Sequence, residues 1–506
     1  MDFYITTPIY YVNDEPHLGH AYATILADVL ARYARLQGSQ TFFLTGVDEH
    51  GQKAQEAARL HGLEPQAYVD LMHTRYQSAW LELEVTNDDF IRTTQPRHVS
   101  VVEHVLSQLW QQGDIYLGEY QGWYCVPDER FWTEKDLRDG LCPDCGRPVE
   151  PVSEPNYFFR MSRYQDWLVD YIQTHPDFIL PALRRNEVLG FLRQPLGDLC
   201  ISRPVSRLNW GIPLPFDPGF VTYVWFDALL NYVTAAGYLV DEARFARLWP
   251  QAHHLIGKDI LTTHSVYWPT MLQAAGLPMP RAIFATGWWT VDGEKISKSR
   301  GNAVKPLELA KIYGVEPFRY YLMSQMLPGH DADFSRERLA GIYQADLANN
   351  LGNLLHRVVN MISRYCAGRI PSPASAAEAD DDTHALIRLC ESMPGRVFAA
   401  VADFDTPQAL AACRDVLDAA NQYLEHQAPW KRRDAGPQGA NTCLYTAAET
   451  LRLVTLLLSP VMPERCAEVW RRLGWQSPAA PGDGLAWGKL QPGAPVTPGE
   501  PLFPRI

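Results

Sequence analysis

Apolar and polar positions in the first third of the chain follow two periods in turn, and this alternation predicts an α/β domain. Largely apolar runs at residues 3–9 and 41–45 are typical of buried strands. Apolar residues over 17–36 recur at the spacing of one helix face, and Gly38 supplies a stop signal. Three more stretches have helical signals: 51–61, 65–83 and 97–113. Strands that alternate with helices favour a parallel sheet with helices on both faces.

The pattern changes twice further along the chain. Residues 114–222 are rich in aromatic residues, proline and cysteine, which indicates an insertion, and strand signals of the first kind return at 221–225, 254–257 and 282–285. Beyond about residue 330 strand signals vanish, and long amphipathic runs such as 338–366 indicate a helical bundle. We therefore expect a core at 1–113 and 223–290, the insertion at 114–222, a connecting region at 291–337, an all-α domain at 338–474 and an extended proline-rich tail at 475–506.

The composition limits the classes of protein to which the chain can belong. A chain of 506 residues, 46% of them hydrophobic, should fold into about two to four domains with a large core. The net charge of −13 argues against a broad basic surface for nucleic acid but allows local basic patches. We find no run of about 18 apolar residues and no signal-peptide pattern. Most of the nine cysteines stand singly in apolar helical stretches, so we expect a cytoplasmic protein with reduced cysteines and no membrane segment.

A short basic loop is the first candidate for chemistry. Within residues 295–303, Lys295 and Lys298 stand on either side of Ser297. A hairpin turn is predicted just before them, at Asp292-Gly293. Two cations on a short loop suit the neutralisation of a triphosphate whose charge grows in a transition state. A solvated basic loop would have the same sequence, so this loop by itself leaves both interpretations open.

A second motif lies near the N-terminus, where residues 16–20 are Pro-His-Leu-Gly-His. It follows the first predicted strand and opens the first predicted helix. His17 and His20 are three residues apart and share one face of the first turn. Free backbone N–H groups and the helix dipole make that turn an anion site, and Gly19 leaves room for a nucleotide. The alternative is a pair of surface histidines that cap the helix.

Together the two motifs resemble the signature sequences of class I aminoacyl-tRNA synthetases. Residues 16–20 resemble the HIGH motif with leucine in second place, and 295–299 resemble KMSKS with isoleucine for methionine. The similarity extends over nearly the full length. Longer blocks are similar to the methionyl-tRNA synthetases in particular: TGVDEHGQK at 45–53, TYVWFDALLNY at 222–232 and HLIGKDILTTHSVYWPTML at 254–272.

The resemblance implies both a fold and a two-step reaction. The fold is a Rossmann-type parallel-sheet core with an inserted zinc-knuckle connective domain, followed by an all-α helix-bundle anticodon-binding domain. Members of the family join L-methionine and ATP into methionyl-adenylate with release of pyrophosphate. They then transfer methionine to the 3′ end of initiator and elongator tRNA(Met). Mg²⁺ is expected to travel with ATP, and catalysis to rest on positioning and electrostatic stabilisation.

Roles for individual residues follow from the same resemblance. The expected catalytic side chains are His17, His20, Lys295 and Lys298. The expected ATP site adds Gly19, Gly257, Asp259 and Ser297. The expected methionine site consists of Ile9, Tyr11, Asp48, Trp225, Ala228, Leu229, Tyr232, Ile260 and His264. Asp48 follows the second predicted strand, where a carboxylate can pair with the substrate ammonium, although it could instead cap the next helix. Periodicity alone would place most of the wall residues in the core.

A cysteine knuckle lies within the predicted insertion. Cys142 and Cys145 are separated by a tight turn, and Cys125 lies upstream. Zinc-bearing relatives pair this knuckle with a second Cys-x-x-Cys, but here Asp128 replaces the second cysteine. Asp is a legitimate zinc ligand, so one structural Zn²⁺ at a Cys3Asp site is the preferred interpretation. A partly lost site without metal is the alternative.

Residues for anticodon reading are also implied by the resemblance. They are Asn353 and Arg357, four apart on one helix face, and Trp430. Amide and guanidinium groups suit the edges of unstacked bases, and tryptophan suits stacking. Without the resemblance, Arg357 would be interpreted as solvated and Trp430 as a core anchor. No further tRNA-binding domain follows residue 506, so we expect a monomer.

Three other functions are compatible with parts of this pattern. A class I synthetase for leucine, valine, isoleucine or cysteine would share the two signature motifs, but the block around Trp225 argues against it. A nucleotidylyltransferase without a tRNA substrate would leave the helical domain without a role. A non-catalytic tRNA-binding relative would not need His17, His20, Lys295 and Lys298.

Overall fold

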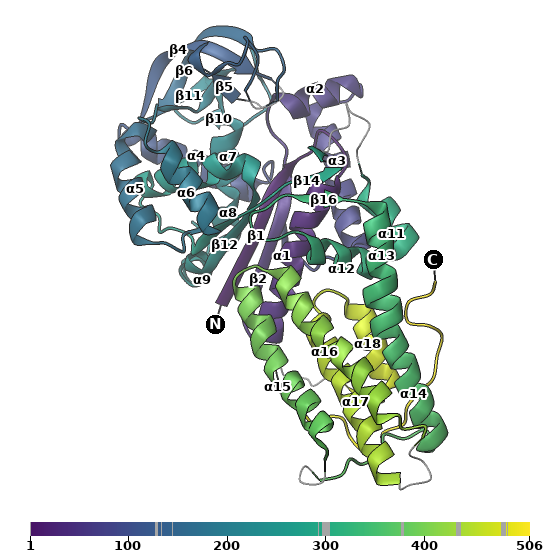
Figure 1. Cartoon of the computed structure of the whole chain (residues 1–506). Coiled ribbons are helices and arrows are strands. Elements are labelled where there is room, and N and C mark those ends of the chain that lie inside the picture. Colours follow the sequence, from purple (N-terminus) through teal and green to yellow (C-terminus); the bar gives the residue numbers. More distant parts are fainter. Residues whose placement is uncertain are drawn as a thin grey trace.

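The computed structural model describes residues 2–126, 130–132, 134–143, 145–291, 293–295, 304–375, 379–431, 437–476, 482 and 484–505. An α/β part with an antiparallel extension at one end rests on an elongated bundle of helices (Figure 1). No helix within these described residues is both long and apolar enough to cross a membrane.

The centre of the α/β part is a six-stranded sheet in which all neighbours are parallel. Its order is β3-β2-β1-β12-β13-β7. The strands are β1 (Asp2–Tyr11), β2 (Gln40–Asp48), β3 (Asp89–Arg92), β7 (Ile179–Leu180), β12 (Ala252–Gly257) and β13 (Ala282–Thr286). The chain goes from β1 outward to β2 and β3, and then crosses to the other side of β1, where β7, β12 and β13 lie, so the connection order reverses between β1 and β12. The predicted parallel α/β core is confirmed.

Alternate residues of these strands enter two hydrophobic cores, one on each face of the sheet. Leu255 packs into the core that contains α1, whereas its neighbour Ile256 packs into the core that contains α4. Both side chains are fully buried, as the period of two in a strand requires. The helices of these layers are α1 (Leu18–Leu36), α2 (Gln52–Leu60), α3 (Pro65–Glu82), α4 (Pro96–Gln111), α8 (Asn231–Ala236) and α10 (Trp268–Ala274).

The segment between β3 and β12 contains most of the antiparallel structure. The long strands β4 (Ile115–Cys125) and β6 (Glu150–Phe159) pair with each other, and β5 (Arg130–Trp132) and β8 (Leu199–Cys200) flank them. A second small sheet contains β9 (Ser202–Pro204), β10 (Pro213–Leu214) and β11 (Asp217–Thr222). After helix α5 (Gln165–Thr174), the two residues of β7 return to the central sheet and pair with β13, and helix α6 (Ala182–Phe191) follows.

The structure corrects one predicted strand. Residues 221–225 do not form a core strand: β11 ends at Thr222 in the small antiparallel sheet, and the short helix α7 (Val224–Leu229) begins at once. Helix α9 (Glu242–Leu248) precedes β12. The apolar run Val-Thr-Tyr-Val-Trp is common to a strand and to a buried helix, and periodicity over five residues cannot separate them.

A small sheet and three helices connect the core to the bundle. The sheet contains β14 (Trp289–Val291), β15 (Glu294–Lys295) and β16 (Ala332–Phe334). The helices are α11 (Pro306–Tyr313), α12 (Val315–Gln325) and α13 (Arg336–Ile342). The antiparallel pairing of β14 with β15 confirms the predicted hairpin turn, and Gly293 adopts φ +75° there, a conformation that glycine accepts without strain.

The rest of the chain is helical, as predicted. The helices are α14 (Asn353–Tyr365), α15 (Asp381–Ala402), α16 (Thr406–Gln427), α17 (Pro437–Leu458) and α18 (Pro463–Arg472). A π-helical segment, Tyr343–Gly352, joins α13 to α14. The last segment, 484–505, has no helix or long strand, but it is packed: Leu502 and Phe503 are buried, and Arg452 donates to the carbonyls of Gly484 and Ala486.

One buried arginine ties the bundle to the core. The guanidinium of Arg319, on α12, donates to Asp28 of α1 at 2.6 Å. It also donates to the carbonyls of Leu83, Pro460 and Val461. Burial alone would raise the pKa of Asp28, but Arg319 and Arg32 lower it below its ordinary value, so the carboxylate stays charged.

Candidate active site

A cavity of about 520 Å³ opens at the carboxyl ends of four neighbouring strands. The last residues of β1, β2, β12 and β13 all line it: Tyr11, Asp48, Gly257 and Thr286. Parallel sheets bind ligands at this edge, where the connection order reverses, because the strand ends and helix N-termini leave a crevice there. The cavity is therefore the main candidate for the active site.

The predicted ATP and methionine residues meet around this one cavity. Those whose side chains the structure describes all line it: Ile9, Tyr11, His17, Gly19, His20, Asp48, Trp225, Ala228, Leu229, Tyr232, Gly257, Asp259, Ile260 and His264. They come from segments up to about 250 residues apart in the sequence, as the positions of Ile9 and His264 show. Their placement together is a property of the fold, and their individual roles remain predictions.

The two histidines of the first motif shape the N-terminus of α1. His17 is the N-cap, and its Nδ1 accepts from the backbone N–H of Gly19 at 3.0 Å. The rings of His17 and His20 stack with centroids 3.6 Å apart. A Cβ on Gly19 would lie 3.0 Å from the His17 ring, so glycine permits the stack. The turn thus presents imidazole and backbone N–H groups to the cavity, an arrangement suited to anions.

The loop after β12 forms the opposite wall of the same region. A Cβ on Gly257 would lie 2.4 Å from an oxygen of Asp259, so a larger residue there would displace the Asp259 side chain. Trp288 donates from Nε1 to Asp259 at 3.3 Å, and the ammonium of Lys258 lies 4.1 Å from the centre of the Trp288 ring. Lys258 also pairs with Asp331 at 2.6 Å. These contacts hold Asp259 beside the cavity.

The basic loop starts where the hairpin ends. Lys295 is the last residue of β15, paired in register with Thr290 of β14. Trp289, the first residue of β14, lines the cavity, so the hairpin starts at its edge. The positions of Ser297 and Lys298, and the side chain of Lys295, lie outside the described residues.

The predicted methionine wall is aromatic and largely buried. Tyr11 and Trp225 meet edge to face with ring centroids 6.2 Å apart. Tyr232 and His264 are 1% and 2% exposed, and the Tyr232 hydroxyl lies 2.8 Å from Nε2 of His264. Burial lowers the pKa of His264 to about 4. Since Nδ1 of His264 faces the carbonyl of Ile260, which can only accept, Nδ1 carries the proton and Nε2 accepts from Tyr232.

Asp48 lines the same cavity as this wall. It is 3% exposed and ends β2, paired in register with Tyr11 of β1. The following helix α2 begins at Gln52 with Gly51 as its N-cap, so Asp48 does not cap it. The alternative interpretation of Asp48 as a helix cap is therefore wrong.

Sequence reasoning missed several residues that line the cavity. Tyr76 donates from its hydroxyl to the carbonyls of Tyr11 and Asp14, and so holds the loop between β1 and α1. Its sequence signal was ordinary helix periodicity, which indicates only burial. Asn231 lines the cavity from α8. Arg147 is exposed and belongs to the cysteine knuckle, and no local pattern connects it with a site formed by the core.

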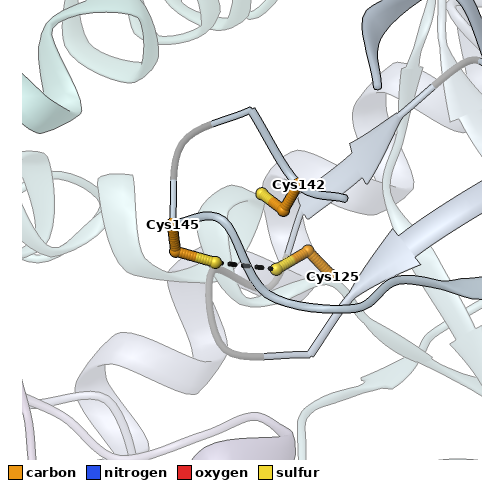
Figure 2. A group of neighbouring side chains, drawn as sticks. All are labelled: Cys125, Cys142 and Cys145. Carbon is orange, nitrogen blue, oxygen red and sulfur yellow. Dashed lines mark hydrogen bonds between the residues drawn. The ribbon is translucent and has the colours of Figure 1, made fainter. Parts of the chain in front are cut away.

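The three cysteines of the knuckle converge (Figure 2). The Sγ atoms of Cys125, Cys142 and Cys145 all lie within 4.8 Å of one another, and those of Cys125 and Cys145 are 3.5 Å apart. Sulfurs bound at about 2.3 Å to one tetrahedral zinc would be about 3.8 Å apart, so this geometry fits three metal ligands. The predicted fourth ligand, Asp128, lies outside the described residues.

The knuckle and the cavity are connected through the backbone. The amide of Cys142 donates to the carbonyl of Arg147 at 2.9 Å, and the amide of Gly146 donates to the carbonyl of Cys142 at 2.9 Å. The turn that holds the thiols therefore also sets the position of Arg147 at the cavity rim.

The predicted anticodon residues lie together on the helical domain. Asn353 is exposed at the start of α14, and Arg357 lies one turn later. Arg357 pairs with Glu425 at 2.7 Å and lies 5.7 Å from the centre of the Trp430 ring. Trp430 is 37% exposed, so it is not a core anchor. An exposed amide, a guanidinium and an indole face are suited to unstacked bases.

Two family models match the chain. The model described as tRNA synthetases class I (M) matches residues 3–150 and 145–359. The model described as the anticodon binding domain of methionyl tRNA ligase matches residues 372–506.

Known proteins are similar over the whole chain. The methionine–tRNA ligase of Caldanaerobacter subterraneus subsp. tengcongensis is 46% identical across all of this chain and 79% of its own length. That of Thermotoga maritima is 45% identical across all of this chain and 80% of its own length. The Mycobacterium tuberculosis methionyl-tRNA synthetase in complex with methionyl-adenylate superposes with a TM-score of 0.96 at 40% identity, covering all of both chains.

Proposed function

The chain belongs to the methionine–tRNA ligases, the class I synthetases that activate methionine with ATP and charge tRNA, and we propose how its residues divide this work. The observation that supports the division is the single cavity at the strand ends. The histidine turn at the start of α1 lies on its rim together with Asp48 and the aromatic wall. One cavity can thus bring a nucleotide phosphate to a bound amino acid.

In the first step, a carboxylate oxygen of methionine attacks the α-phosphorus of ATP. A bond forms from that oxygen to phosphorus, and the bond from phosphorus to the bridging oxygen of pyrophosphate breaks. No side chain forms a covalent bond, so the enzyme contributes alignment and charge stabilisation. We assign phosphate binding to His17, His20 and the free N–H groups of α1, adenosine binding to Gly257 and Asp259, and pyrophosphate stabilisation to Lys295 and Lys298.

Methionine recognition needs one charged contact and one apolar pocket. The buried carboxylate of Asp48 is assigned to the ammonium group of the substrate. The thioether enters the wall of Tyr11, Trp225 and Tyr232, where aromatic edges suit a polarisable sulfur. Neutral His264 fits this role because a charged imidazole would have to be desolvated beside an apolar side chain.

Two metal ions have different roles in this proposal. Mg²⁺ enters with the ATP phosphates and requires no protein cage. One Zn²⁺ would be held by Cys125, Cys142, Cys145 and Asp128, and its role would be structural, because it would tie strand β4 to the turn that carries Cys142 and Cys145. Elemental analysis of the purified protein should give one zinc per chain, and Cys145→Ser should reduce it to well below one. Full zinc content in that variant would contradict the ligand assignment.

The second step transfers methionine to the 3′-terminal adenosine of tRNA(Met). Asn353, Arg357 and Trp430 are assigned to the anticodon. Because Glu425 already orients the Arg357 guanidinium beside Trp430, the pair can present a hydrogen-bonding edge and a stacking face together.

Methionine-dependent ATP–pyrophosphate exchange tests the activation step. Wild-type protein should exchange with methionine, and far less with leucine, isoleucine, valine or cysteine. Lys298→Ala should abolish most of the exchange. Lys305→Ala is the matched control, since Lys305 is an exposed lysine that pairs with Glu308 outside the cavity. Exchange that depends on another amino acid, or equal loss in both variants, would contradict these assignments.

A further inference from the structure

A buried carboxylate on α7 joins three segments of the core. Asp227 is fully buried, and both of its oxygens accept hydrogen bonds from imidazoles. Oδ2 lies 2.6 Å from Nδ1 of His50, and Oδ1 lies 2.6 Å from Nε2 of His98. Burial alone would raise the pKa of Asp227, but the two histidines lower it to about 2, so the group is a carboxylate. We refer to Asp227, His50 and His98 as the carboxylate clasp.

The clasp connects the two halves of the core that the insertion separates. His50 follows Asp48 by two residues, just beyond β2, and His98 lies in the first turn of α4. Asp227 comes from the second half, on α7. None of the three lines the cavity, yet Asp48, Trp225 and Ala228 all do. The clasp therefore lies directly behind the predicted methionine pocket.

The segment that carries His50 is braced from its other side. The Glu49 carboxylate accepts from Arg92 at 2.7 Å and from the hydroxyl of Thr94. The indole of Trp210 donates to the carbonyl of Glu49 at 2.6 Å, and the amide of Gly51 donates to the carbonyl of Trp210. These hydrogen bonds therefore fix the position of His50 relative to Asp48.

Helix α7 is not stable by itself. It spans six residues, Val224–Leu229, and has no side-chain cap at its N-terminus. A helix this short is not stable without tertiary contacts, so its position is set by what its side chains bind. Trp225 and Ala228 face the cavity, while Asp227 reaches the clasp. Through His50, the carboxylate ties this helix to the Asp48 segment.

We propose that Asp227 is a positioning residue that sets methionine affinity by holding α7, and with it Trp225, at a fixed distance from Asp48. The inference rests on the proposed function, because Asp48 and Trp225 are there assigned to the two ends of methionine. One substrate must meet both contacts at once, so a shift of α7 by about 1 Å should cost about 10²-fold in kcat/KM for that substrate. ATP contacts neither α7 nor the clasp in this assignment and should bind as before.

The test compares substrate dependences in pyrophosphate exchange. Asp227→Ala should lower kcat/KM for methionine by about 10²-fold through KM, with the KM for ATP changed by less than about twofold. Asp227→Asn should recover most of that loss. Its oxygen can accept from His50, and its amide can donate to Nε2 of His98 if the His98 proton moves to Nδ1, which lies 3.4 Å from the Thr234 hydroxyl.

A matched control uses another buried carboxylate. Asp28→Asn alters a fully buried aspartate that accepts from two arginines and does not line the cavity. It should lower the melting temperature and leave the KM for methionine and ATP unchanged. If Asp227→Ala does not fold, His98→Phe tests the positioning role of Asp227 in its place. That change removes one donor while an aromatic ring stays at the position, and it should raise the methionine KM by about tenfold.

Three outcomes would overturn the inference: an unchanged methionine KM in folded Asp227→Ala or in His98→Phe, a parallel rise in both KM values, or no recovery in Asp227→Asn. Failure of the proposed function would look different, since the wild-type protein would then show no methionine-dependent exchange.

Discussion

Removing the negative charge of Asp48 gives the most direct test of the methionine site. Asp48→Asn keeps the shape of the side chain but cannot form an ion pair with the substrate ammonium. Asp48 is 3% exposed, so solvent screens the pair poorly. Unit charges about 4 Å apart at an effective dielectric constant of about 20 interact by about 4 kcal/mol, and losing one partner of a buried pair costs at least about 2 kcal/mol.

These values predict a rise in the methionine KM of about 30- to 700-fold, since about 1.4 kcal/mol is a factor of ten. The assay is pyrophosphate exchange with methionine varied at saturating ATP, and then with ATP varied at saturating methionine. The KM for ATP should change by less than about threefold, because Asp48 and the assigned adenosine site lie on different strands, β2 and β12.

Asp259→Asn is the matched control within the same cavity. It removes a carboxylate from the loop after β12 and should raise the KM for ATP while the KM for methionine stays near the wild-type value. A deaminated analogue of methionine should inhibit Asp48→Asn and wild type equally, because the lost interaction is with the ammonium. A methionine KM within about threefold of wild type in Asp48→Asn would refute the assignment.

Three further predictions concern stability and tRNA. Arg319→Met should reduce the free energy of unfolding by about 3 kcal/mol in urea titrations, because Asp28 loses a buried partner; a loss below about 1 kcal/mol would contradict this. Burial lowers the pKa of His264 to about 4, so the unfolded chain takes up a proton first and stability falls as pH drops from about 6.5 towards 4. Melting temperatures of His264→Gln should therefore depend less on pH in that range, and an equal dependence would count against it. Trp430→Ala should weaken tRNA(Met) charging by about 5- to 150-fold, from about 1–3 kcal/mol of base stacking, without altering pyrophosphate exchange; a loss in both assays would indicate a structural role instead.

Local patterns were sufficient for much of the site. The turn with His17 and His20, the hairpin that precedes Lys295 and the knuckle of Cys142 and Cys145 are each encoded within a few consecutive residues. Spacing within a turn or hairpin determines which side chains share a face, so such features are visible before any fold is known. The helices and the parallel core follow from hydrophobic periodicity for the same reason.

Short elements and long-range polar contacts were not visible in this way. The segment 221–225 is apolar enough for a strand, but the chain forms helix α7 directly after Tyr223. In this helix, Asp227 accepts hydrogen bonds from two buried imidazoles. The two residues of β7 have no strand signal in the sequence. They form a strand by pairing with β13 at the edge of the sheet. Arg147 reaches the cavity through the knuckle, far from any motif of the core.

The sequence by itself therefore determined the class of fold, the order of its domains and the local motifs to which we assign most of the chemistry, because these depend on neighbours a few residues apart. Only the tertiary structure decided which distant segments are held together by polar contacts. Asp227 with His50 and His98, Arg319 with Asp28, and Arg357 with Glu425 are pairings across 68 to 291 positions in the chain. A lone aspartate or arginine in a sequence gives no sign of a partner at such a distance. Its burial becomes tolerable only when folding brings the opposite charge or donor within hydrogen-bonding reach.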